Sequence, residues 1–299
     1  MTIPQKGAAA ALLSYLWWGS MPLYWKTLLS VSSFEILGHR VVWSAVFTLA
    51  LIILTGQGGK AVAFAAKNRQ KTLWLFLGGY LITFNWGLYI WAVNAGRILE
   101  TSLGYYINPL VSMLFGMLFF GERLRRAQKL AIAVAAAGVC IQIITIREIP
   151  LVSLGLALSF GLYGAMKKAI SIEPAVALVI ETLSVAPAAL AYLCWLQHTG
   201  AAHFPYALTT DLLLAGTGVM TSVPRLLFAY AAQRIKLTTI GFIQYVSPTM
   251  TFLIGTFIYH EPLSIYRIIT FACIWSALAV YSADTLIEAG RERRTQEYI

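Results

Sequence analysis

The stretch YYINPLVSMLFGMLFFGERL, residues 105–124, decides the fold, because its pattern returns later as IQYVSPTMTFLIGTFIYHEPL, residues 243–263. The two copies align 139 positions apart without a gap. The aligned identical positions include Tyr106 and Tyr245, Pro109 and Pro248, Gly116 and Gly255, Glu122 and Glu261, and Leu124 and Leu263. An apolar segment repeated in this register indicates an internal duplication.

The composition is that of a helical membrane protein. The 299 residues are 59% hydrophobic and only 11% charged, whereas soluble domains carry about 25% charged residues. The apolar residues come in blocks of roughly twenty, the length that crosses a ~30 Å hydrocarbon core. We predict ten spans, at residues 7–27, 34–54, 72–93, 101–120, 127–146, 150–167, 174–196, 208–231, 238–259 and 264–286.

The basic charges follow this predicted topology. The formal net charge is +10, which could suggest a nucleic-acid partner. With a cytoplasmic N-terminus, however, sixteen of the 22 Lys and Arg residues fall on the cytoplasmic side of the ten spans. We therefore expect a multi-pass protein of the inner membrane with both termini in the cytoplasm and the lipid bilayer, not nucleic acid, as its partner. The three cysteines lie inside spans with no Cys-x-x-Cys or His-rich cluster, so we expect no metal site and no cofactor.

The duplicated segments belong to the fourth and ninth spans, so the repeated unit holds five spans. The halves are residues 1–147 and 148–299, and SYLWWG in the first span resembles SFGLYG in the sixth. An odd number of spans per unit makes the two halves enter the membrane in opposite directions. Inverted repeats are typical of secondary transporters, which bind their substrate near the midplane and alternate its access. We predict an all-α membrane protein of ten transmembrane helices, arranged as two inverted five-helix repeats.

Several motifs carry a closer resemblance, in order along essentially the whole chain. They are LYWKTL, EILGHRVVWS, LGYYINPLVSMLFG, GERL, LALSFGLYG, GFIQYVSPTMTFL and EPLS. This set resembles the RarD group of EamA-type carriers in the drug/metabolite transporter superfamily. The resemblance implies a ten-helix inner-membrane carrier of small molecules. Within that superfamily, YddG-type carriers export amino acids and the RarD group is named for a drug-sensitivity association, so an amino-acid exporter and a drug efflux permease both stay open.

Pro109 and Pro248 lie inside the fourth and ninth spans. A proline within a helix removes one backbone hydrogen bond and kinks the helix, and in a transporter the freed carbonyl can face a cavity. Each is followed by a pair of small residues that permits close helix packing, Ser112 with Gly116 and Thr251 with Gly255. We expect two kinked central helices in which the prolines act in gating; the alternative is tolerated kinks without a role.

Aromatic and amide side chains gather in the spans that we expect to face one another. Rings would cover the apolar part of an amphipathic solute, and hydroxyls and amides would hold its polar groups. We predict that Trp17, Asn85, Tyr89, Tyr106, Tyr163, Gln244 and Tyr245 bind substrate. Trp and Tyr also form belts at membrane interfaces, and we assign Tyr24, Trp25, Trp91 and Tyr105, near the predicted span ends, to such belts.

Charged side chains inside spans are the strongest pointer to function, because each costs ~2.5–3.5 kcal/mol at the bilayer centre. By the helical rise, Arg40 lies about 10 Å below the outer end of its span and Glu181 about 10 Å above the inner end. A direct Arg40–Glu181 bridge is therefore not expected. Arg225 is level with Glu181, and we predict that these two form a structural ion pair.

His39 and Arg40 are expected to face the outer half of the cavity. Arg40 could bind a substrate carboxylate through two hydrogen bonds, or it could be a snorkelling arginine bonded to carbonyls. Glu122 and Glu261 close the fourth and ninth spans on opposite faces of the membrane, where they could latch loops differently in two states.

The remaining question is the class of transport and its energy source. The first and sixth spans hold no glutamate, which disfavours the proton coupling of multidrug relatives, although His39 is of a type that titrates near neutral pH. No Walker motif is present to use ATP. A channel would need rings of carbonyls or like charges, and no catalytic set converges for an enzyme. We expect a secondary carrier of small molecules that functions as a monomer.

Overall fold

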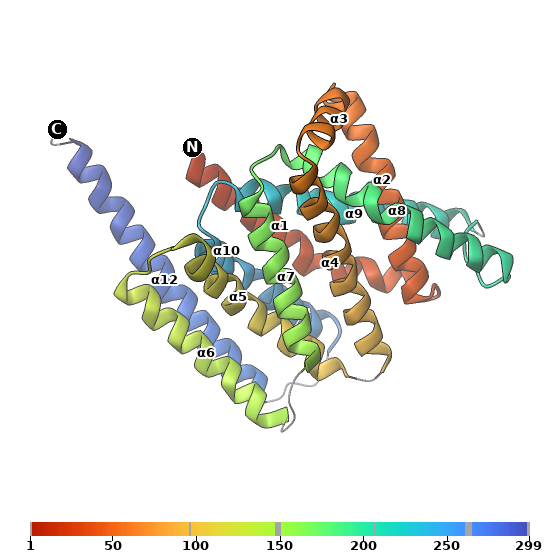
Figure 1. Ribbon diagram of the computed structural model, residues 1–299. Helices are drawn as coiled ribbons and strands as arrows, with labels where there is room; N and C mark the ends of the chain where they lie inside the picture. The colour runs from red at the N-terminus through yellow and green to blue at the C-terminus, as the bar shows by residue number, and fades with distance from the viewer. Residues whose placement is uncertain (1, 96, 147–150, 206, 261–264, 298–299) are drawn as a thin grey trace.

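The computed structural model describes residues 2–95, 97–146, 151–205, 207–260 and 265–297, and in these ranges the chain forms helices and connections without a strand (Figure 1). In order, the helices are α1 (Ile3–Trp25), the 3-10 turn η1 (Lys26–Leu28), α2 (Ser33–Leu54), α3 (Gly58–Lys67), α4 (Arg69–Asn94), α5 (Ile98–Phe120), α6 (Arg126–Ile146), α7 (Leu151–Ala169), α8 (Pro174–His198), α9 (Leu208–Ala232), α10 (Leu237–Gln244), α11 (Val246–Leu253), the π-helical turn η2 (Ile254–Ile258) and α12 (Ile265–Glu297).

Seven segments of the described chain are long and apolar enough to cross a membrane. They lie in α2, α4, α5, α8, α9, the α10–η2 segment and α12. The other three predicted spans are also helices and pack among these seven: α1 lies on α9 and the α10–α11 segment, α6 on α12, and α7 on α4 and α5. The chain is thus an all-helical protein with the makeup of a multi-pass membrane protein, and the full count of ten crossings stays a prediction.

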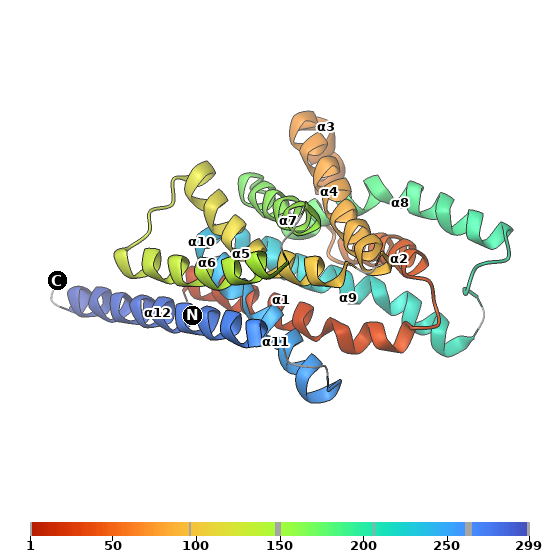
Figure 2. The ribbon, with the colours of Figure 1, turned by 90° about the horizontal axis from the view of Figure 1, so that it is seen from below.

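Successive long helices run in alternating directions, so their ends collect at two ends of the bundle (Figure 1). We call the end that holds the start of α1 and the last turns of α12 the terminal end. The α5–α6 and α9–α10 connections lie there too, whereas the α1–α2 and α4–α5 connections lie at the opposite end. In the second view α6 and α12 run side by side along one edge, with α8 at the other (Figure 2).

The helix contacts repeat between the two halves. α4 packs on α7 and α8, just as α9 packs on α1 and α2. α5 packs on α7, as the α10–α11 segment packs on α1, and α2–α8, α5–α10 and α6–α12 pair across the halves. Exchanging each predicted span for the one five spans later reproduces this set of contacts. The pattern is the one expected of a duplicated five-helix unit, whose inversion in the membrane stays a prediction.

The fourth and ninth predicted spans differ in continuity. α5 runs through Pro109 without interruption, whereas the ninth span ends one helix at Gln244, turns at Tyr245 and starts another at Val246. Pro248 has no N–H to return to the carbonyl of Gln244 four residues earlier, which weakens the helix at this point. The two prolines therefore have different consequences, and only the later copy divides its helix.

Candidate functional site

A cavity of about 400 Å³ lies among the central helices, bounded by α1, α2, α4, α5, α7 and the α10–η2 segment. This volume falls in the ~300–1,000 Å³ range of small-molecule sites. Its aromatic wall consists of Tyr15, Trp18, Trp25, Trp86, Tyr89, Tyr105, Tyr106, Phe160 and Phe252, and its polar wall includes Arg40, Asn85, Asn108, Gln244, Ser247 and Thr251. Because Trp25 and Thr256 are at helix ends, the cavity extends toward the opposite end of the bundle.

Arg40 of α2 supplies the charge in this wall. Its Nε donates to Thr221 Oγ1 at 3.2 Å, and its guanidinium carbon lies 4.1 Å and 4.8 Å from the ring centroids of Trp86 and Trp25. Cation–π contacts of this kind stabilise an arginine that has little water around it. Among the described residues no carboxylate pairs with Arg40, and none lines the cavity. The arrangement leaves a guanidinium available to an anionic group of a solute.

The predicted lining residues divide between the cavity and the packed core. Asn85, Tyr89, Tyr106 and Gln244 line the cavity together with Arg40, and Pro248 lies in its wall. Asn85 is held in place because its Nδ2 donates to Ser159 Oγ and to the carbonyl of Leu156, both at 2.8 Å.

Three of the aromatic residues predicted to bind substrate do not line the cavity. Tyr163 and Tyr245 are buried in the core, and the Tyr245 hydroxyl donates to the carbonyl of Tyr106 at 3.3 Å. On α1 it is Trp18, and not Trp17, that reaches the cavity. Consecutive helical residues point about 100° apart, so only one of the two indoles can face the lumen.

The same geometry separates His39 from Arg40. The His39 ring lies 5.0 Å from the ring of Phe204, and its Nδ1 accepts a hydrogen bond from Trp43 Nε1 at 3.2 Å. It lines a second, mostly apolar pocket between α2 and α8. The structure therefore places His39 outside the central cavity, because the turn that points Arg40 inward points His39 toward α8.

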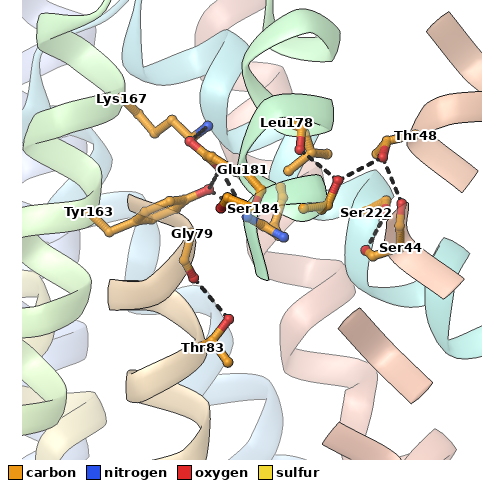
Figure 3. Close-up of polar contacts among 12 residues, drawn as sticks. Ser44, Thr48, Gly79, Thr83, Tyr163, Lys167, Leu178, Glu181, Ser184 and Ser222 are labelled. Atoms are coloured by element: carbon orange, nitrogen blue, oxygen red, sulfur yellow. Dashed lines mark hydrogen bonds and ion pairs between the residues drawn. The ribbon is translucent and has the colours of Figure 1, made fainter. Parts of the chain in front are cut away.

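The predicted partners Glu181 and Arg225 are in contact. Arg225 Nη2 lies 3.0 Å from Glu181 Oε2, and the Tyr163 hydroxyl donates to the same oxygen at 3.2 Å. Lys167 bonds the other carboxylate oxygen. Figure 3 shows Tyr163 and Lys167 reaching Glu181 from one helix, beside a chain of hydroxyls that includes Ser44, Thr48 and Ser222. The result is a buried cluster with two cations and one carboxylate.

Lys167 was not expected in this cluster. The predicted topology places Lys167 at the cytoplasmic end of the sixth span, but α7 continues to Ala169 and the Lys167 side chain is only 2% exposed. The signal in the sequence is its spacing from Tyr163, because residues four apart share one face of a helix.

The cavity is closed toward the terminal end by contacts between α5 and α10. Ser112 Oγ donates to Gln244 Oε1 at 3.2 Å. Farther along, the Glu122 carboxylate accepts the backbone N–H groups of Leu237 and Thr238, at 2.7 and 2.8 Å, at the start of α10. Lys168 Nζ of α7 lies 3.3 Å from Glu122 Oε1. Glu122 thus joins three helices, while its predicted counterpart Glu261 lies outside the described residues.

The position of the Glu122 carboxylate also explains why residue 116 of α5 is a glycine. A Cβ on Gly116 would lie 2.6 Å from Glu122 Oε2 and 3.1 Å from the backbone nitrogen of Thr238. Such contacts are far inside van der Waals distance, so only glycine lets α5 and α10 approach this closely.

Two aromatic residues assigned to interfacial belts also line the cavity. They are Trp25 and Tyr105, and the rings of Tyr105 and Tyr89 are 5.7 Å apart. A cavity that extends toward the end of the bundle takes part of its wall from helix ends, so the belt assignment stays a prediction while their place in the cavity wall is an addition to it. Asn108 was also missed, although an amide within an apolar run directly before a proline is an unusual residue choice in a span.

These features define a class, namely a helical membrane protein with a ligand-sized cavity that extends toward one end of the bundle and is bounded at the other by contacts between α5 and α10. Residues 5–144 and 149–283 each match the EamA-like transporter family, one match in each predicted half. The chain belongs to this family, whose members are transporters.

Individual relatives agree with that assignment. An "Uncharacterized transporter" of Vibrio cholerae serotype O1 is 44% identical over 98% of this chain and 97% of its own length. "Protein RarD" of Salmonella typhi is 42% identical over 94% of this chain and 96% of its own. "Chloramphenicol-sensitive protein RarD" of Pseudomonas aeruginosa is 30% identical over 95% and 96%. A solved structure titled "Crystal structure of protein" shares the fold, with a TM-score of 0.71 at 17% identity over 92% of this chain and 96% of that one.

Proposed function

We propose that this protein is a secondary transporter that exports small amphipathic metabolites bearing a carboxylate, with amino acids as the leading class, across the bacterial inner membrane. The observation that carries the proposal is Arg40, a guanidinium in the cavity wall beside Trp25 and Trp86 with no carboxylate partner in the described chain. A carboxylate matches the two N–H groups at an arginine edge. The surrounding rings suit the apolar part of the same solute.

The transport cycle that we propose is alternating access by a single chain. The cavity lies wholly within one chain, and it is closed at the terminal end by Glu122 and by the Ser112–Gln244 contact. With the N-terminus in the cytoplasm, as the basic residues predict, the end toward which the cavity extends would face the outside. Export then requires a second conformation in which the terminal end opens and the opposite end closes.

A drug efflux permease of the same fold is the alternative function. Two observations favour it: a relative bears the name "Chloramphenicol-sensitive protein RarD", and the cavity volume of about 400 Å³ also suits a drug-sized ligand. The two functions share the cavity and differ in which solute it selects.

Counterflow in proteoliposomes separates these functions. Labelled threonine and phenylalanine would be tested for uptake into vesicles preloaded with unlabelled amino acids, with and without a pH gradient, and with chloramphenicol as a competitor. Saturable uptake that the preloaded amino acid stimulates supports the exporter, and its response to the gradient decides proton coupling. A monodisperse preparation with no amino-acid uptake contradicts the amino-acid proposal, whereas a flux that does not saturate indicates a channel.

A further inference from the structure

Two buried polar atoms of the cavity wall have no hydrogen-bond partner in the described part of the chain, the hydroxyl of Tyr15 and the amide oxygen of Asn108. A hydroxyl can donate or accept, but the amide oxygen can only accept. Asn108 is 5% exposed and sits on α5, beside the lumen. A buried acceptor without a donor is unfavourable, so this position can take a donor from a bound solute.

The backbone near Asn108 also offers hydrogen-bond acceptors. Pro109 follows directly, and it has no N–H to bond the carbonyl of Tyr105 four residues earlier. Pro248 likewise returns no bond to the carbonyl of Gln244, where α10 ends. Tyr105 and Gln244 both line the cavity, and the carbonyl end of a helix carries partial negative charge. This part of the wall is therefore rich in acceptors, whereas Arg40 offers donors alone.

We infer that Asn108 is the second recognition residue of the site, which accepts a hydrogen bond from a donor group of the same solute whose carboxylate binds Arg40. The inference rests on the proposed function and narrows it: the solute carries a carboxylate and a separate N–H or O–H donor, as the ammonium group of an amino acid does. A carboxylate that lacks the donor leaves Asn108 unpartnered. An amine that lacks the carboxylate leaves Arg40 without a counter-charge.

Competition in counterflow tests this with three matched probes. Against labelled phenylalanine, the competitors are unlabelled phenylalanine, 3-phenylpropanoate, which lacks the ammonium group, and 2-phenylethylamine, which lacks the carboxylate. In the wild type we expect phenylalanine to compete about tenfold more strongly than either analogue, the size of one charge-assisted hydrogen bond. Asn108→Leu should remove the preference for phenylalanine over 3-phenylpropanoate and leave the affinity for 3-phenylpropanoate within about threefold.

A matched control makes the same change outside the cavity. Asn68 lies between α3 and α4, where its Nδ2 donates to the carbonyl of Phe64 at 3.3 Å, and Asn68→Leu should keep the wild-type preference. If Asn108→Leu does not fold, Asn108→Asp replaces it, because it keeps the acceptor and should retain the preference for phenylalanine.

The outcomes distinguish a failure of the amino-acid proposal from a failure of the role assigned to Asn108. Wild-type protein without saturable counterflow of phenylalanine overturns the carboxylate–donor inference together with the amino-acid proposal. Saturable counterflow in which Asn108→Leu weakens phenylalanine and 3-phenylpropanoate by the same factor, or in which Asn108→Asp loses the preference, overturns the role of Asn108 alone.

Discussion

Replacing Glu181 by glutamine should destabilise the protein far more than replacing either neighbouring cation by an apolar residue of similar size. Glu181 is the one carboxylate between Lys167 and Arg225, and all three side chains are at most 4% exposed. The change Glu181→Gln keeps the shape of the side chain but leaves two cations buried together. The change Lys167→Met instead leaves the Glu181–Arg225 pair, in which the charges balance.

The magnitudes follow from this difference in charge. Removing one partner of a buried ion pair typically costs about 3–5 kcal/mol, whereas replacing buried charge by well-packed apolar groups is often neutral or stabilising. We therefore expect Glu181→Gln to lose about 3–5 kcal/mol and Lys167→Met to stay within about 1 kcal/mol of the wild type. Glu173→Gln is a matched control, because Glu173 and Lys60 are 3.8 Å apart with 47% and 70% of their side chains exposed, and such surface pairs contribute about 0–1 kcal/mol.

The assay is thermal unfolding of the purified proteins in one detergent, followed by intrinsic fluorescence and by monodispersity after heating. On the scale of soluble domains, the expected loss for Glu181→Gln corresponds to a fall of about 10 °C in apparent melting temperature. If the melting temperature of Lys167→Met falls as far as that of Glu181→Gln, charge balance is not what stabilises the cluster. A melting temperature unchanged by Glu181→Gln would exclude charge balance equally.

Three further experiments test the site and its motion. Arg40→Ala should abolish transport of carboxylate solutes and leave a folded protein, measured by counterflow and gel filtration; transport at the wild-type rate would remove Arg40 from the site. Pro109→Ala and Pro248→Ala should slow turnover without loss of expression, with the larger effect at Pro248, where the helix is divided; unaffected turnover would make both prolines passive. Glu122→Gln weakens the cap on α10 and should raise thiol labelling of a Ser112→Cys reporter from the terminal end, while unchanged labelling would show that Glu122 does not hold that end closed.

The positions of the helices could be predicted because each apolar block is as long as a membrane is thick. Every predicted span is occupied by helix in the described residues. The division of the ninth span could not be predicted from its proline alone, because α5 contains a proline at the aligned position and continues through it. Whether a helix bends or breaks at a proline depends on the neighbours that compensate for the missing hydrogen bond.

Helix rotation was the main limit in predicting the site. Depth along a helix follows from residue number, which is why the Glu181–Arg225 contact could be anticipated. The direction in which a side chain points around the helix cannot be predicted from residue number in the same way. A membrane helix is apolar all round and lacks the polar stripe that orients a surface helix. Neighbours such as Trp17 and Trp18, or His39 and Arg40, therefore could not be assigned to core or cavity from the sequence.

The aligned residues of the two central segments now occupy different surroundings. Ser112 and Gln244 are hydrogen-bonded at 3.2 Å, whereas the residues that align with them, Thr251 and Tyr105, line the cavity. If the halves exchanged conformations, Thr251 and Tyr105 would meet as a hydroxyl pair while Ser112 and Gln244 separated.

One polar side-chain contact between the two central segments would then replace another, so the two conformations would differ little in free energy. A small difference is what a carrier needs, because a solute can shift the equilibrium only by the difference in its affinity for the two states. In the transport cycle proposed above, the duplicated segment gives one chain two conformations of similar stability, with the proposed solute site of Arg40 and Asn108 between them.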